Sequence, residues 1–142
     1  NWLKSGDNTD SAAPTKGASV LLVDDSDFFR NMVRPVLTVA GYDVVTVSSG
    51  ASALALMEEG HDFDLIISDI EMPNMNGCEL AREIKAGDRW TDVPLVALSS
   101  LATERDIKRG LDAGFDDYVA KFDKETLLRS LSQLLKIRGD AA

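Results

Sequence analysis

Carboxylates, hydroxyls and one lysine directly follow short apolar runs at several points along the chain. They are Asp24, Asp25, Asp69, Ser99, Ser100 and Lys121. Clustered carboxylates repel one another, and a hard divalent cation with oxygen ligands relieves that repulsion. A lysine and a hydroxyl placed beside them supply the positive charge and the hydrogen-bond donor that phosphoryl transfer needs. If the fold brings these side chains together, they indicate metal-assisted phosphoryl chemistry.

Each of these residues has a simpler interpretation when it is taken alone. Asp69 after a strand is typical of a turn cap, and the pair Asp24-Asp25 suits the positive end of a helix macrodipole. Lysines such as Lys121 are usually solvated, and Ser100 is also explained as a plain loop serine. The case for chemistry depends on whether all of them arrive at one place.

The apolar runs before these residues predict strands, and amphipathic segments between them predict helices. The expected strands are 19–23, 43–47, 64–69, 93–98 and 116–120. Helices are expected after the cap Ser26, over 51–59, after the Asn76-Gly77 turn, over about 102–112 and after the cap Asp123. This alternation predicts an α/β fold, a parallel sheet with right-handed crossovers and helices on both faces. All strands then end at one edge, where such folds place their chemistry.

Two helices carry signs of weakness. Pro35 interrupts the first helical pattern, where it removes a backbone hydrogen bond. The segment 102–112 has only Ile107 and Leu111 as apolar anchors and contains Gly110, so we expect it to be the least stable helix.

Length and composition set the class of the protein. With 142 residues the chain suits one domain, which we place at 19–138, with a flexible linker or terminal tail at 1–18 and a C-terminal tail at 139–142. A net charge of −9 disfavours nucleic acid as a direct partner. The sequence shows no signal peptide and no run of roughly 18 apolar residues, and its single cysteine, Cys78, excludes an internal disulfide. We therefore expect a cytoplasmic protein.

The ordered set of motifs resembles the receiver (response-regulator) domain of two-component signalling. It consists of the run 20–25 ending in Asp24-Asp25, Asp69 followed by Met72-Pro73 and Gly77, the run 96–99 ending in Ser99, and Tyr118 three residues before Lys121. The intervals between these motifs also match, and the resemblance covers about 19–138. It implies a flavodoxin-like (βα)5 fold with strand order 2-1-3-4-5.

The resemblance also implies a role for each acidic residue. Asp69 would accept a phosphoryl group from the phosphohistidine of a histidine kinase or phosphotransfer domain. Mg²⁺, with Mn²⁺ as a substitute, would be bound by Asp25, Asp69 and the backbone carbonyl of Glu71, and by Asp24 directly or through water. The chain would be a phosphoacceptor that promotes its own phosphorylation and dephosphorylation, and not an enzyme acting on another substrate.

Four further residues would bind the phosphoryl group and respond to it. Lys121 would pair with its charge, Ser99 would donate a hydrogen bond, and the small Ser100 would leave the acceptor accessible. Tyr118 would move into the space that Ser99 vacates, although it also fits a half-buried strand aromatic. The change would appear on the face of the fourth helix, fifth strand and fifth helix, where a downstream or intramolecular protein partner would bind, with neither nucleic acid nor membrane involved.

Two positions depart from the usual pattern of the family. Phe122 follows Lys121 where proline with a cis bond is common; a non-proline cis bond costs about 3–4 kcal/mol, so the peptide is either strained or trans. Lys-Phe at this point, together with residues 1–18, indicates a chemotaxis-type hybrid histidine kinase. Glu71, two residues after the acceptor, would repel the phosphoryl group or orient a water.

Two alternatives remain at this stage. A haloacid-dehalogenase-type phosphatase also uses an aspartyl phosphate and magnesium, but its D-x-D-x-[TV] motif is matched here only by Asp25 and Asp27, with Phe29 at the last position. That family also leaves Asp69 unexplained. A binding-only pseudo-receiver is disfavoured because every carboxylate, the hydroxyl and the lysine are retained.

Overall fold

The computed structural model describes residues 17–100 and 103–141. The tail or linker predicted at 1–18 therefore lies almost entirely outside the described residues.

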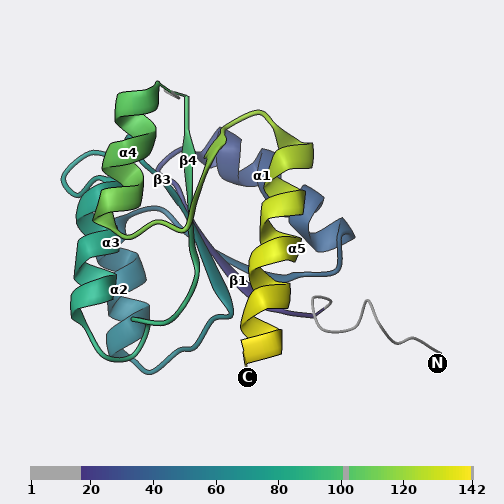
Figure 1. The fold of residues 1–142 in the computed structure, drawn as a ribbon, viewed down its shortest axis with the longest axis horizontal. Helices are drawn as coiled ribbons and strands as arrows, with labels where there is room; N and C mark the ends of the chain where they lie inside the picture. Colours follow the sequence, from purple (N-terminus) through teal and green to yellow (C-terminus); the bar gives the residue numbers. More distant parts are fainter. Residues whose placement is uncertain (1–16, 101–102, 142) are drawn as a thin grey trace.

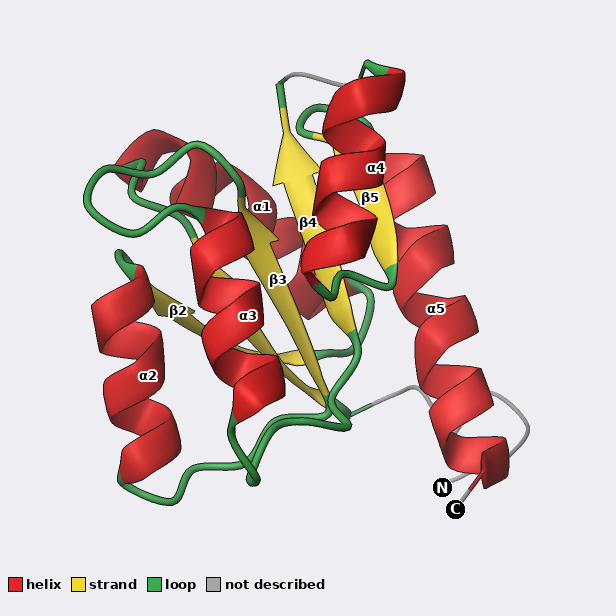
Figure 2. Ribbon diagram, turned by 60° about the vertical axis from the view of Figure 1, so that its left-hand side comes forward, coloured by secondary structure: helices red, strands yellow, loops and turns green. Residues whose placement is uncertain are grey.

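The strands form one parallel sheet in the order β2-β1-β3-β4-β5, which confirms the predicted topology. The strands are β1 (Ser19–Val23), β2 (Asp43–Val47), β3 (Leu65–Asp69), β4 (Leu95–Ser99) and β5 (Asp117–Ala120). Figure 2 shows β3 and β4 in the middle of the sheet with helices in front of it and behind it. Because the strands are parallel, their carboxyl ends lie along one edge.

The helices cover both faces of this sheet. They are α1 (Asp27–Val39), α2 (Gly50–Glu58), α3 (Gly77–Ala86), α4 (Glu104–Ala113) and α5 (Lys124–Ala141). In Figure 1, α2, α3 and α4 lie on one side of the sheet, and α1 and α5 lie on the other. The last helix includes 139–141, which the sequence assigned to a tail; the division into domain and tails otherwise stays a prediction.

Alternating side chains of the central strands pack into two separate cores, one on each face of the sheet. Leu21 and Val23 of β1 pack in the core under α2, α3 and α4, whereas Val20 and Leu22 pack in the core under α1 and α5. Both sets are fully buried, as expected for a strand covered on both faces. The apolar run that forms β1 therefore reflects burial on both faces of the sheet.

Polar caps determine where the helices that flank the site begin. The Ser26 hydroxyl accepts a hydrogen bond from the Phe29 amide at the start of α1. Asn76 and Glu79 form a reciprocal capping box at the start of α3. At α4 the hydroxyl of Thr103 accepts from the Asp106 amide. These caps begin their helices a few residues after the strand ends, which sets the length of the loops at the site.

The prediction that Leu111 anchors α4 is wrong. Leu111 is 46% exposed, and the buried residues of the helix are Gly110 and Ala113. Gly110 lies against the ring of Tyr118, since a Cβ added there would be 2.8 Å from Tyr118 Cδ2. The helix therefore approaches the sheet through its small residues and turns the larger Leu111 outward.

Pro35 lies inside α1 as predicted. It is exposed, as is Asn31, whose carbonyl is the one that loses its helical partner. Water can hydrogen-bond that carbonyl, which explains why proline is tolerated here.

Candidate functional site

The ends of β1, β3, β4 and β5 bring the predicted residues to one edge of the sheet. Asp24 and Asp25 follow β1, Asp69 ends β3, Ser99 ends β4, and Lys121 follows β5. The strand register pairs Val23 with Ser68, Asp69 with Leu98, and Ser99 with Ala120. The convergence that the sequence required is therefore a direct result of parallel pairing.

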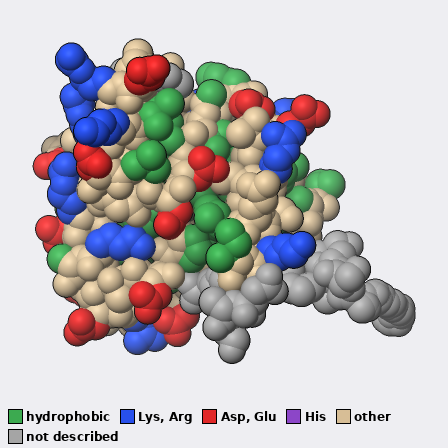
Figure 3. Space-filling model, viewed as in Figure 1, with side chains coloured by type: hydrophobic (Ala, Val, Ile, Leu, Met, Phe, Trp, Pro, Cys, Tyr) green, Lys and Arg blue, Asp and Glu red, His purple; other side chains and the backbone are tan. Residues whose placement is uncertain are grey.

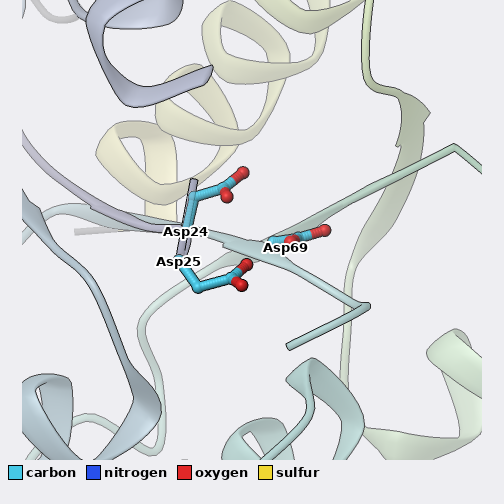
Figure 4. Close-up of side chains that lie close together, drawn as sticks. All are labelled: Asp24, Asp25 and Asp69. Atoms are coloured by element: carbon cyan, nitrogen blue, oxygen red, sulfur yellow. The ribbon is translucent and has the colours of Figure 1, made fainter. Parts of the chain in front are cut away.

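Three carboxylates form the centre of the site. Asp24, Asp25 and Asp69 each offer an oxygen, and these oxygens lie within 4.8 Å of one another. Figure 4 shows the three side chains extending side by side from the strand ends. Asp24 and Asp69 are buried, while Asp25 is exposed. The cluster is thus closed on the protein side and open on one side to solvent.

Lys121 supplies the positive charge beside this cluster. Its Nζ lies 3.4 Å from Asp24 Oδ2 and 3.3 Å from Asp69 Oδ2. The same Nζ lies 4.6 Å from the centroid of the Phe29 ring, within cation–π range. Phe122 packs edge-on against that ring, with centroids 5.8 Å apart. The peptide between Lys121 and Phe122 is trans, as are all peptides in the described residues, so the lysine reaches the site without a cis bond.

Burial and crowding shift the pKa values of these groups. Burial, and secondarily the charge of Asp24, raises the pKa of Asp69 to about 7, against the opposing effect of Lys121. Burial also raises the pKa of Asp24, although the Ser26 amide and Lys121 lower it in part. Burial alone would lower the pKa of Lys121, but Asp69 and Asp24 raise it overall. The lysine therefore keeps its proton while two carboxylates compete for one cation.

The carboxylates fit a divalent metal ion. Asp24 Oδ1 accepts from the Ser26 amide at 2.8 Å, and Asp69 Oδ1 accepts from the Glu71 amide at 3.3 Å. The Oδ2 atoms of Asp24 and Asp69 are buried and share the Lys121 ammonium as their cationic neighbour. One lysine does not balance three clustered carboxylates, and Mg²⁺ prefers oxygen ligands.

Glu71 and Ser99 lie beside the cluster and contact each other. The Ser99 hydroxyl, which is fully buried, donates to Glu71 Oε2 at 2.5 Å. Ser100, an exposed residue, places its amide and its hydroxyl each 3.4 Å from Glu71 Oε1. Burial raises the pKa of Tyr118, and a hydrogen bond with the Ser99 side chain opposes that shift. The sequence singled out all four residues but did not predict that Glu71 joins two of them.

Gly77 allows α3 to begin close to the end of β3. A Cβ at this position would lie 2.4 Å from the backbone oxygen of Asp69 and 2.9 Å from Ile70 Cα. The Gly77 amide donates to the carbonyl of Ile70 at 3.0 Å. Because backbone atoms cannot yield as a flexible side chain can, only glycine fits this approach.

Two contacts of the site were not predicted from the sequence. In the sequence, Phe29 stood out only as a mismatch to the D-x-D-x-[TV] motif, whereas its ring lies under the lysine. Arg30 donates from Nη1 to the carbonyl of Asp24 at 2.5 Å. Both residues lie in the first turn of α1, shortly after Asp24 and Asp25. This position in the sequence could have indicated that they contact the site.

Other sequence features have structural roles. Cys78 is buried in the first turn of α3, and burial raises the pKa of its thiol. His61 is exposed in the loop before β3, and its carbonyl accepts from Trp90 Nε1 at 2.9 Å.

Two open grooves lie on the surface away from the carboxylates. One is lined by charged residues of α3 and α4: Arg82, Glu104, Arg105, Lys108, Arg109 and Asp112. The other, largely apolar, is lined by Pro35, Val36, Val39, Ala40, Lys124 and Leu128. Neither groove includes a residue of the acidic cluster. None of the helices in the described part of the chain combines the length and apolar character needed to cross a membrane.

The fold and the site together define the class of flavodoxin-like signalling domains, with an acidic cluster, a hydroxyl and a lysine at the carboxyl edge of a parallel sheet. Residues 20–132 match the family model of the response regulator receiver domain. The chain belongs to this family, the receiver domains of two-component signalling.

Several relatives and solved structures show the same likeness. The chain is 30% identical over 140 residues to the sensor histidine kinase CheAY of Helicobacter pylori, covering 97% of this chain and 17% of that protein. It is 30% identical over 118 residues to a chemotaxis protein CheY homologue of Campylobacter jejuni (serotype O:23/36, strain 81-176), covering 82% of this chain and 91% of that one.

A crystal structure of the receiver domain of the sensor histidine kinase PA1611 from Pseudomonas aeruginosa PAO1 is also similar. It aligns with a TM-score of 0.77 and 32% identity, covering 84% of this chain and 98% of that one. That structure has a magnesium ion coordinated in its active-site cleft.

Proposed function

We propose that this chain is a phosphorylation-dependent signalling switch in which Asp69 accepts a phosphoryl group. The observation that carries the proposal is the position of Lys121 Nζ, 3.3–3.4 Å from the buried Oδ2 atoms of Asp69 and Asp24. Asp69 ends a central strand, and its buried Oδ2 has the Lys121 ammonium as its neighbour. A carboxylate beside a cation that can neutralise the incoming phosphoryl group is suited to attack phosphorus.

The donor in this proposal is the phosphohistidine of a histidine kinase or phosphotransfer domain. An Asp69 oxygen forms the bond to phosphorus as the phosphorus–nitrogen bond breaks, and the freed imidazole keeps the electron pair and takes up a proton. Lys121 neutralises charge on the transferred group, and Ser99 donates its hydroxyl proton to a phosphoryl oxygen. Such transfer depends on positioning and charge cancellation more than on proton chemistry. The chain is then a phosphoacceptor that assists its own phosphorylation and dephosphorylation, not an enzyme with a separate substrate.

Magnesium would be held by Asp24, Asp25 and Asp69, with the backbone carbonyl of Glu71 as a further ligand; Mn²⁺ has the same ligand preference. When bound, the ion would offset the repulsion among the carboxylates and the incoming phosphoryl group. The clustering of these three carboxylates beside a single lysine supports this assignment.

The proposed response involves Ser99, Tyr118 and the face of α4, β5 and α5. Tyr118 is half-buried under Gly110 of α4, so a change at Ser99 reaches that helix through the tyrosine ring. Leu111 of α4 and Ile137 of α5 are exposed, and Figure 3 shows hydrophobic side chains on the face that carries these helices. Exposed apolar groups of this kind suit a protein partner.

Chemotaxis is the pathway favoured by the named relatives. Since the chain spans only 17% of the hybrid kinase it resembles, membership of a hybrid kinase is a proposal, as is the identity of the output partner. The family match gives no support to a haloacid-dehalogenase-type phosphatase. The intact set of Asp24, Asp25, Asp69, Ser99 and Lys121 argues against a binding-only pseudo-receiver.

The test is phosphorylation of the purified chain by acetyl phosphate, with and without Mg²⁺, for wild type and Asp69→Asn. We expect wild type to gain one phosphoryl group by intact mass spectrometry only with Mg²⁺, and Asp69→Asn to gain none. Asp64→Asn, which removes a carboxylate at the opposite end of β3, is the control for nonspecific phosphorylation and should still gain one phosphoryl group. A mass gain that survives Asp69→Asn would contradict the proposal.

A further inference from the structure

The Glu71 side chain bridges two loops of the site. It leaves the loop after β3 and reaches Ser99 and Ser100 at the end of β4. Its carboxylate accepts from the Ser99 hydroxyl at 2.5 Å and lies 3.4 Å from both donors of Ser100. A hydrogen bond from a hydroxyl to a carboxylate is shorter and stronger than one between neutral groups.

A serine hydroxyl carries a single proton, and this limits what Ser99 can do. While that proton is donated to Glu71, it is not available to an oxygen of a group on Asp69. Any donation from Ser99 to a phosphoryl group therefore breaks the contact with Glu71. Because Ser99 is fully buried, water is a poor replacement for either acceptor.

We propose that Glu71 is a positioning residue that holds Ser99 in the resting state and competes with the phosphoryl group for its proton. This inference rests on the proposed phosphoacceptor function of Asp69. The bond between Ser99 and Glu71 stabilises the unphosphorylated arrangement, so it raises the threshold for switching. A neutral or shorter residue at position 71 lowers that threshold.

The same contact connects to Tyr118. The Ser99 side chain is hydrogen-bonded to Tyr118, and the ring of Tyr118 lies against Gly110 of α4. The chain Tyr118–Ser99–Glu71 thus links the β3–α3 loop to the underside of α4. Releasing Glu71 frees one end of this chain.

Glu71 also acts by charge alone, and the test must separate the two effects. The carboxylate of Glu71 is close enough to Asp69 to contribute to its raised pKa, so it also repels an anion bound there. Charge repulsion does not need the Ser99 hydroxyl, whereas competition for its proton does. A double-mutant cycle between positions 71 and 99 isolates the second effect.

The first experiment measures the affinity for beryllofluoride with Mg²⁺ by isothermal titration calorimetry. The proteins are wild type, Glu71→Ala, Ser99→Ala and the double variant. We expect Glu71→Ala to tighten binding about tenfold when residue 99 is serine, and only about two- to threefold when it is alanine. The difference corresponds to the strength of a charged hydrogen bond at a partly exposed site. Glu71→Gln, which loses the charge but keeps an acceptor, should fall between wild type and Glu71→Ala.

The second experiment observes the resting protein without metal or beryllofluoride. In Glu71→Ala and Glu71→Gln, the amide NMR signals of Ser99, Ser100 and Tyr118 should move toward their positions in the beryllofluoride complex of wild type. Glu83→Gln removes an exposed carboxylate of α3 and is the matched control; it should leave these three signals in place.

The outcomes separate this inference from the proposed function. Equal gains from Glu71→Ala in both Ser99 backgrounds, or unmoved signals of Ser99 and Ser100, would overturn the role of Glu71 while leaving Asp69 as the acceptor. If Asp69→Asn instead binds beryllofluoride as tightly as wild type does, the proposed function is overturned.

Discussion

The two halves of the site are held in very different ways. The acidic half is built from buried strand ends: Asp24 and Asp69 are buried, and Lys121 lies between their oxygens. The responsive half depends on side chains that reach between loops, mainly the bonds of Ser99 to Glu71 and Tyr118. A change in the first half disturbs the sheet edge itself, whereas a change in the second alters a few exchangeable contacts. The site thus combines a fixed half, built from strand ends, with an adjustable half, built from side-chain contacts between loops.

Gly77 gives the sharpest test of the fixed half. Gly77→Ala forces a Cβ against the backbone of Asp69 and Ile70, so we expect a loss of about 2–4 kcal/mol in the free energy of unfolding, typical of an overpacked buried position. Urea denaturation at pH 7 measures it. Gly87→Ala, which meets no atom closer than 3.7 Å, is the control and should cost far less. Similar losses in both variants would show that the backbone at the end of β3 can move away from an added Cβ.

Lys121 should stabilise the acidic half in a pH-dependent manner. Lys121→Met leaves the carboxylates of Asp24 and Asp69 without their cation, and we expect a loss of about 1–3 kcal/mol at pH 8 in metal-free protein. At pH 5 the loss should be smaller, because the raised pKa of Asp69, about 7, allows that carboxyl to be neutral there. Denaturation curves at the two pH values check this. A loss independent of pH would mean that Lys121 contributes mainly by packing against Phe29.

The raised pKa of Asp69 predicts how metal-free stability changes with pH. Between 3.8 and about 7 the folded state binds this proton more tightly than the unfolded state does. The free energy of unfolding should therefore fall as pH rises through this range, by about 1–2 kcal/mol in practice. Asp69→Asn removes that dependence and should be the more stable protein at pH 8. Mg²⁺ should restore stability to wild type and not to Asp69→Asn, as followed by thermal melts. Parallel pH profiles for the two proteins would contradict this.

Gly110 tests the adjustable half, where we expect the smallest effect on stability. Gly110→Ala places a Cβ 2.8 Å from the Tyr118 ring, but it also gains about 1 kcal/mol of helix propensity. The two effects should nearly cancel in the free energy of unfolding. The amide signals of Tyr118 and Ser99 should nevertheless shift, because the ring must move. A loss as large as that of Gly77→Ala would remove the distinction between the two halves.

Much of the acidic half could be predicted from the sequence because its determinants are local. Runs of apolar residues predicted strands that are buried on both faces, and parallel pairing puts their ends at one edge. Asp24, Asp25, Asp69, Ser99 and Lys121 each follow or end a strand of this sheet, so their convergence needed no knowledge of side-chain packing. The strand order came from the family resemblance, and the sheet confirms it.

The adjustable half was decided by tertiary structure. The spacing of Leu111 in the sequence predicted a helical anchor. In the structure, α4 instead approaches the sheet through Gly110 and Ala113, and the Tyr118 ring lies against Gly110. The sequence left two roles open for Glu71, repulsion of the phosphoryl group and orientation of water. Neither described its contact with Ser99, a residue 28 positions later. Contacts between loops depend on how far side chains reach in three dimensions, and no periodicity along the chain encodes that. The sequence by itself determined which groups meet at the sheet edge, and the tertiary structure decided which of them touch.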